Sequence, residues 1–172
     1  MAATQILYPQ PCHTTADEAR AAHVYFGFEE DFVEDNIRCI PMIVRFKLDA
    51  CGIKLKLNEW SRMNAAERKV LCETRCLDID DIMQYRACLE RIVLRRTGDC
   101  ATTIPVEPDP AWADTGKLPD ILKNKLAEFN WWLTLQQWAS LSNLHRFALL
   151  KLCRPGHENR NFPKAMKEFF LV

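Results

Sequence analysis

The sequence lacks net charge, phosphate-binding loops and the common metalloprotease motif. Its 172 residues carry 23 basic and 23 acidic side chains, so the formal net charge is zero. A neutral chain creates no overall field that recruits nucleic acid or an anionic membrane, and we expect neither partner. There is no Gly-rich phosphate loop, no H-E-x-x-H motif and no nucleophile with a base beside it. No residue pattern indicates a catalytic site, so we expect a protein that is not an enzyme. A hydrolase or transferase is the weakest hypothesis.

Long apolar runs and an export signal are also missing. The first five residues have neither a basic nor an apolar region, and no later apolar stretch approaches about 18 residues. We therefore expect a cytoplasmic protein. With 48% hydrophobic residues, a chain of this length can bury a core without disulfides or a metal. Residues 1–24 show no sustained periodicity, which predicts a flexible N-terminal tail.

Eight cysteines are present, but their spacing does not resemble that of a metal or iron–sulfur site. No C-x-x-C pair occurs, and Cys72 and Cys76 form the one close pair. In a reducing compartment, scattered cysteines usually act as small buried hydrophobic residues. We therefore expect no bound metal and no cofactor. A cysteine-based carrier remains an alternative if two thiols meet in space.

The sequence does contain an internal repeat. Residues 40–71 align without a gap on residues 118–149, an offset of 118 − 40 = 78, and 9 of the 32 positions are identical. Unrelated segments of ordinary composition would share about 2. Gly52 aligns with Asn130, and these residue types best tolerate the left-handed conformation after a helix. Asn64 aligns with Ser142, and both are good helix N-caps.

Hydrophobic periodicity predicts an all-α, mainly helical protein. The apolar spacing favours helices over residues 41–51, 64–73, 78–96 and 162–170, with a short helix around Trp60. In the helix that follows Asp78, the predicted apolar stripe consists of Ile79, Ile82, Met83, Leu89, Ile92 and Val93.

Two pseudo-repeat helical halves, at about 38–96 and 118–172, are separated by a Pro- and Gly-containing linker over 97–117. Each half alone would leave its apolar stripe half exposed, so we expect the halves to share one core within a single helical domain over 25–172. The alternating segments at 53–57 and 131–135 could pair as a short two-stranded ribbon.

Each half carries the pattern Leu-x-x-Trp-x-x-Met/Leu-x-x-x-x-Arg, which joins Trp60 to Arg68 and Trp138 to Arg146. Trp and Arg dominate the hot spots of protein interfaces, which allows a role in recognition. The favoured interpretation is structural: each indole fills the core and each Arg bridges nearby carbonyls or acids, because an aromatic side chain buries a large area.

Other residues are better candidates for binding a partner. Trp131 and Trp132 are adjacent in an extended segment and face opposite ways, so one indole is expected at the surface or under a partner. A polar cluster follows Pro155-Gly156 and is flanked by Arg154 and Arg160, and such a loop could dock a carboxylate or serve as an ordinary turn. The candidate residues are Arg38, Trp131, Trp132, His157, Glu158 and Asn159.

Long ordered strings in the sequence resemble the nitrate reductase-associated protein family. They are Phe28-Glu29-x-Asp31-Phe32-Val33, the run from Ile37-Arg38-Cys39-Ile40-Pro41 to Leu55, Arg146-Phe147-Ala148-Leu149-x-Lys151-Leu152, and His157-Glu158-Asn159-x-Asn161-Phe162. The resemblance covers about residue 26 to the end of the chain and leaves the first 25 residues outside.

The resemblance implies an accessory protein of bacterial assimilatory nitrate reductase, a cytoplasmic enzyme with molybdenum and an iron–sulfur cluster. Such a protein would be needed for the activity or maturation of the reductase and would act by protein–protein binding. The family offers no catalytic residues to transfer to this chain. The alternative is a cysteine-based redox or cluster carrier that serves a molybdenum enzyme, which requires at least two convergent thiols with thiolate character.

Overall fold

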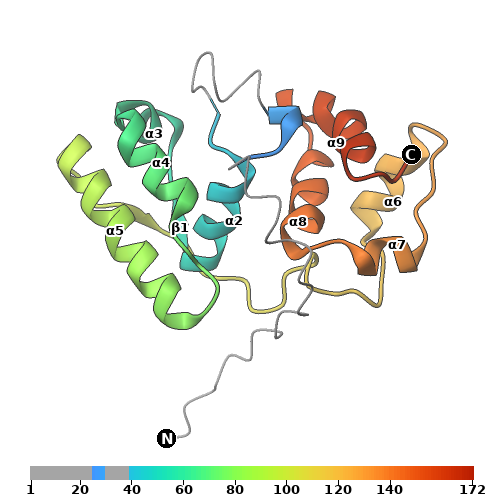
Figure 1. The fold of residues 1–172 in the computed structure, drawn as a ribbon, viewed down its shortest axis with the longest axis horizontal. Coiled ribbons are helices and arrows are strands. Elements are labelled where there is room, and N and C mark those ends of the chain that lie inside the picture. The colour runs from blue at the N-terminus through green and yellow to red at the C-terminus, as the bar shows by residue number, and fades with distance from the viewer. Residues whose placement is uncertain (1–24, 30–38) are drawn as a thin grey trace, which may run out of the picture.

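The structure, a computed structural model, describes residues 25–29 and 39–172, without the side chains of residues 157 and 158. The predicted flexible tail over 1–24 and the candidate Arg38 lie outside the described residues. The described part contains eight α-helices and a single ribbon of two short strands (Figure 1). The mainly helical fold class predicted from the sequence is confirmed.

The helices fall into two groups that lie side by side in Figure 1, with α2 and α8 in contact between them. The first group comprises α2 (Met42–Cys51), β1 (Ile53–Lys54), α3 (Leu57–Arg62), α4 (Ala65–Glu73) and α5 (Ile79–Thr97), while the 3₁₀ turn η2 (Gly27–Glu29) contacts α9 of the second group. After β2 (Thr102–Thr103), the second comprises α6 (Asp120–Ala127), α7 (Leu135–Ser140), α8 (Asn143–Leu152), η3 (His157–Asn161) and α9 (Phe162–Glu168).

Side-chain caps fix where several helices begin, as the sequence predicts. At the start of α4, the Asn64 side chain accepts from the Glu67 amide at 2.9 Å and the Glu67 carboxylate accepts from the Asn64 amide at 2.9 Å, a reciprocal capping box. The carboxylate of Asp78 accepts from the Asp81 amide at 2.8 Å and opens α5. Gly52 ends α2 in the left-handed conformation.

The starts of three helix pairs differ by the repeat offset. The helices α2 and α6 begin at residues 42 and 120, α3 and α7 at 57 and 135, and α4 and α8 at 65 and 143, each pair 78 apart. The left-handed residues that follow α2 and α6 are Gly52 and Asn130, which are also 78 apart. These equal offsets support the pseudo-repeat, which stays a prediction for the two halves as whole units.

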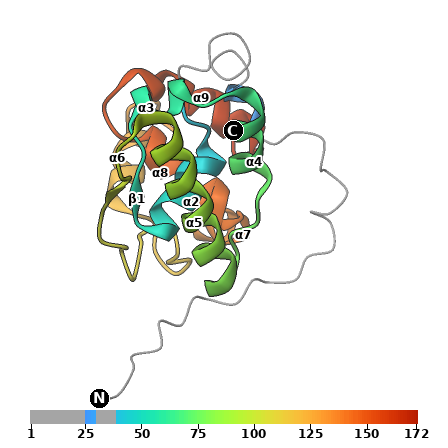
Figure 2. The same ribbon diagram turned by 90° about the vertical axis from the view of Figure 1, so that its left-hand side faces the viewer.

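The expectation of one common core is corrected by the structure. Two separate clusters of buried apolar residues are present, one around Trp60, Tyr85 and Leu89 and the other around Trp138 and Phe147. Helix α2 contributes to both, because Val44 lies in the first cluster and Met42 in the second. Figure 2, seen from the side of α5, shows α5 outside α2, which it contacts. The buried apolar residues of α3, α4 and α5 therefore lie in one cluster, and those of α6, α7, α8 and α9 lie in the other.

Two residues of the predicted stripe on α5 lie at the surface. Ile79 and Met83 are 60% and 63% exposed, while Ile82, Leu89, Ile92 and Val93 are buried as predicted. The aromatic ring that completes the buried face is that of Tyr85. Ile79 and Met83 therefore lie on a side of α5 that the described chain leaves exposed.

The predicted ribbon has a different partner. Strand β1 pairs antiparallel with β2, so that Ile53 lies opposite Thr103 and Lys54 opposite Thr102. The expected pairing of residues 53–57 with residues 131–135 is wrong, because strand β2 in the linker pairs with β1 instead.

Candidate functional site

The two Trp–Arg units have the same local geometry. Trp60 and Trp138 are buried, with 1% and 0% of their surfaces exposed. Arg68 Nε donates to the Trp60 carbonyl at 3.2 Å, and Arg146 Nη1 donates to the Trp138 carbonyl at 3.4 Å. Each guanidinium also lies over its indole, 5.6 Å and 5.8 Å from the ring centroid. In both halves the pair joins a short helix to the helix that follows.

Arg146 is bound more fully than Arg68. It is 5% exposed, and its Nε donates to the Trp112 carbonyl in the linker at 2.7 Å. Further donors reach the Leu141 carbonyl and the Asn143 side chain. Burial lowers the pKa of the Arg146 guanidinium, and these oxygen acceptors replace the water that it has lost. Arg146 therefore joins the linker to α7 and α8, and all of its described hydrogen bonds go to acceptors within the protein.

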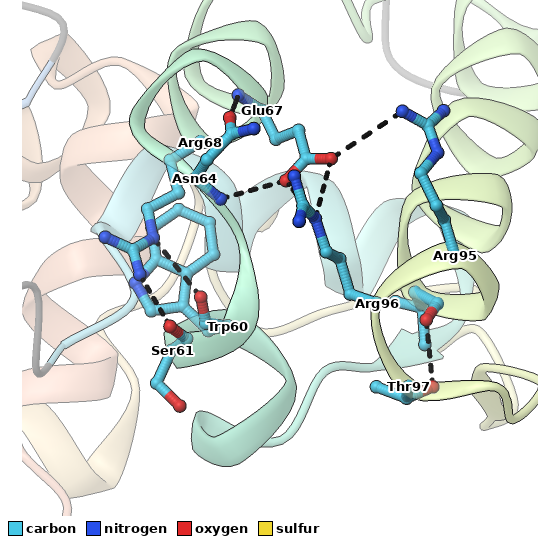
Figure 3. A network of polar contacts seen from close by, with 9 residues as sticks. Trp60, Ser61, Asn64, Glu67, Arg68, Arg95, Arg96 and Thr97 are labelled. Atoms are coloured by element: carbon cyan, nitrogen blue, oxygen red, sulfur yellow. Dashed lines mark hydrogen bonds and ion pairs between the residues drawn. The ribbon is translucent and has the colours of Figure 1, made fainter.

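In the first half, a polar network joins α4 to α5 beside Trp60 (Figure 3). Arg96 Nε donates to both carboxylate oxygens of Glu67, at 3.0 Å and 2.8 Å, and Arg95 lies 3.8 Å from the same carboxylate. Burial alone raises the pKa of Glu67, but the hydrogen bonds from Arg96 and from the Asn64 amide outweigh it and hold the pKa below its ordinary value. This network joins α4 to α5 and thereby stabilises the fold of the first half.

The Trp131-Trp132 pair lies at the surface of the second half. The Trp131 ring stacks on Phe129 at a centroid distance of 4.8 Å and packs against the buried cluster, whereas Trp132 is 80% exposed. A hollow of about 260 Å³ opens beside them. It is lined by Trp131, Trp132, Gln137, Leu171 and Val172. The two indoles thus have different surroundings, one against the core and one toward solvent.

The other candidate residues are less informative. Residues 157–159 lie in η3. The Asn159 amide donates to the Gly156 carbonyl at 3.3 Å, and Asn159 is half-buried. The side chains of His157 and Glu158, like Arg38, lie outside what the structure describes. Of the six candidates, the structure brings together Trp131 and Trp132.

Four cysteine thiols are held in a protonated state by burial. Burial raises the pKa of Cys51 and Cys72 to about 11, and that of Cys76 and Cys153 to about 12. Within the described ranges, no group of three or more His, Cys, Asp or Glu side chains is arranged to hold a metal ion. A thiol with a raised pKa is a poor nucleophile and a poor ligand. These four cysteines therefore act as small apolar residues within or against the two buried clusters.

We expect the free energy of unfolding to fall as the pH rises above 9, the ordinary pKa of these thiols. Between that value and about 12, the unfolded chain loses thiol protons that the folded chain retains, so the unfolded state gains stability with pH. Below this range the contribution is constant. Urea unfolding at neutral and alkaline pH measures how steeply the free energy of unfolding falls with pH. Cys76→Ala should make this dependence on pH weaker, and Cys100→Ala, at an exposed position, should leave it unchanged. Equal labelling rates of Cys76 and Cys100 by N-ethylmaleimide would contradict this account.

The sequence patterns missed one exposed aromatic residue. Phe170, two residues beyond α9, is 80% exposed and has a left-handed backbone with φ of 56°. It directly precedes Leu171 and Val172, which line the hollow beside Trp132. Because Phe170 is apolar, the sequence pattern predicted instead that the last helix extends to this residue. Hydrophobic periodicity does not indicate that a residue of this size adopts the left-handed backbone conformation and lies at the surface.

Taken together, the fold and the site define a small helical protein with protonated buried thiols and an exposed apolar surface at one end. No helix in the described ranges has both the length and the apolar character to cross a membrane. The sequence matches the conserved nitrate reductase-associated protein family over residues 25–169, and the chain belongs to this family. No curated protein and no solved structure matches the chain.

Proposed function

We propose that the chain is an accessory protein that binds cytoplasmic assimilatory nitrate reductase and is required for its activity or maturation. The observation that carries this proposal is the family match over residues 25–169, nearly the whole chain. In this proposal the chain itself catalyses no reaction and acts through protein–protein contact.

The surface of the second half supports a binding role. An apolar hollow beside an indole that is 80% exposed resembles the centre of a protein interface, where aromatic residues are enriched. The alternative of a cysteine-based carrier receives no support from the described thiols, because burial raises the pKa of four of them.

Co-purification tests the proposal. The tagged chain and the reductase are expressed together, and nitrate reduction is measured with and without the chain. We expect a complex with the apo- or holo-reductase, and reductase activity that depends on the chain. The double variant Cys72→Ser and Cys76→Ser should retain full activation. Absence of any complex with either form would refute the proposal, and loss of activation in the double variant alone would favour the carrier.

A further inference from the structure

We infer that the outer face of α5 pairs with the same face of a second copy of the chain, so that the protein forms a symmetric dimer with antiparallel α5 helices. This inference goes beyond the proposed function, because the contact joins two copies of the chain and needs no reductase. The outer face of α5 consists of the exposed residues opposite its buried stripe, namely Asp80, Met83, Gln84, Ala87, Arg91 and Leu94.

The outer face of α5 carries a line of exposed apolar side chains. Met83, Ala87 and Leu94 recur at helical spacing, and Met83 and Leu94 are 63% and 51% exposed. Helix α5 has 19 residues and lies at the outer edge of the first group, and its outer side faces the viewer in Figure 2. An apolar line along a long helix is the arrangement through which two helices pair.

The ion pairs within the chain leave two charges on this face. Most charged side chains of α5 are engaged by neighbours. The pairs are Arg86–Glu90 at 2.9 Å, Asp81–Arg75 at 3.4 Å, Arg95–Glu67 at 3.8 Å and Arg96–Glu67 at 2.8 Å. Among the described residues, no ion pair involves Asp80 or Arg91, and both are exposed. The outer face therefore keeps one anion in the first turn of α5 and one cation three turns later.

These two charges make the face complementary to itself. In a symmetric antiparallel pair, residues that lie opposite each other have position numbers with a constant sum, and each contact occurs twice. Placing Asp80 opposite Arg91 of the second copy sets this sum at 80 + 91 = 171. The same register brings Leu94 opposite Leu77, 94 + 77 = 171, and these side chains are 51% and 69% exposed. Opposite charges and exposed apolar residues thus meet in one register.

The centre of this register is suited to close packing. Gln84 and Ala87 of the two copies lie opposite each other there, 84 + 87 = 171, and the small side chain of Ala87 lets the helix axes approach. Met83 of each copy then lies beside Ala87 of the other. The antiparallel direction also places the positive end of each helix dipole beside the negative end of the other.

Other arrangements of the outer face are less favourable. A parallel pair would place Asp80 against Asp80 and Arg91 against Arg91, which brings like charges together. A lipid surface would bury both of these charges along with the apolar line, because they lie on the same side of the helix. We therefore assign the face to a second copy, and treat a lipid surface and the reductase as outcomes of the test.

Charge reversal in the full-length chain tests the inference. Light scattering after size exclusion measures the mass over a range of protein concentrations. We expect a wild-type dimer that salt weakens. Asp80→Arg and Arg91→Asp should each dimerise about 10-fold or more weakly, because like charges then meet at two symmetric positions. Asp109→Arg and Arg154→Asp make the same exchanges at exposed positions outside α5 and should dimerise like the wild type.

Mixing the two weakened variants gives the sharpest result. When Asp80→Arg pairs with Arg91→Asp, opposite charges meet again at both symmetric positions, so we expect the mixed dimer to form. Leu94→Ser removes an apolar contact without changing charge and should also weaken the wild-type dimer. Circular dichroism should show that every variant keeps its helices, because the replaced side chains are exposed.

Several results would overturn the inference. A wild type that is monomeric at every concentration does so, as does a dimer that both charge reversals leave intact. Failure of the two variants to associate on mixing overturns the antiparallel register. Reductase binding, or sedimentation with vesicles of phosphatidylcholine and phosphatidylserine, that is lost in Asp80→Arg while the wild type is monomeric assigns the face to another partner. Binding of the wild type to the reductase is measured separately, so the proposed function stands or falls by itself.

Discussion

Replacing Arg146 by methionine should lower the free energy of unfolding by about 3 kcal/mol or more, whereas the same change at Arg68 should cost about 1 kcal/mol. Arg146 is 5% exposed and serves acceptors from three segments, among them the Trp112 carbonyl of the linker. Arg68 is half-buried and donates to the Trp60 and Ser61 carbonyls. Removal of the buried guanidinium leaves several carbonyls without a donor and without water.

Urea unfolding followed by circular dichroism measures both losses. Arg146→Lys is the informative control, because it keeps the charge but lacks the planar set of donors that reaches several acceptors. It should fall between the wild type and Arg146→Met. Equal losses for Arg146→Met and Arg68→Met would show that the linker contact adds nothing to the stability of the second half.

Gly52→Ala should be the most damaging exchange among the glycines, with a loss of about 3 kcal/mol. Gly52 has a φ of 66°, and a β-carbon there would lie 2.8 Å from the Ile104 carbonyl oxygen and 2.9 Å from a methyl of Val106. The Ile104 amide donates to the Gly52 carbonyl at 2.9 Å, so the linker cannot move away without breaking the ribbon. Strain and overlap therefore act at the same residue.

Gly98 provides the matched control for this exchange. It is also left-handed, with a φ of 80°, but a β-carbon there meets nothing within 4 Å. Gly98→Ala should therefore cost about 1 kcal/mol, the penalty for the backbone conformation alone. Thermal unfolding of the two variants separates the strain from the overlap. A smaller loss for Gly52→Ala than for Gly98→Ala would mean that the linker does not pack on α2 as described.

Local signals predicted much of the helical fold. Asn64, Asp78 and Gly52 mark helix ends through interactions within a few residues, so their roles are visible in the sequence. The buried positions of Trp60 and Trp138 agree with the structural interpretation of the repeated pattern. The acceptors of Arg146 were harder to foresee, because Trp112 is 34 residues away in the chain.

Features that depend on long-range packing were not predictable from local patterns. The pairing of Ile53 with Thr103 depends on the path of the linker, and a strand of two residues carries too little periodicity to identify its partner. Ile79 and Met83 have helical spacing, but only the position of the neighbouring helices decides that they are exposed. Phe170 shows the same limit, because its left-handed conformation contradicts its residue type.

A direct titration tests the central claim, that this protein acts by binding nitrate reductase through its surface. The full chain is titrated calorimetrically into purified apo-reductase, and the complex is sized by light scattering. We expect saturable binding, weakened by salt and by Trp132→Ser but not by Met83→Ser. No heat and no change in mass with either the apo- or the holo-reductase would contradict the account.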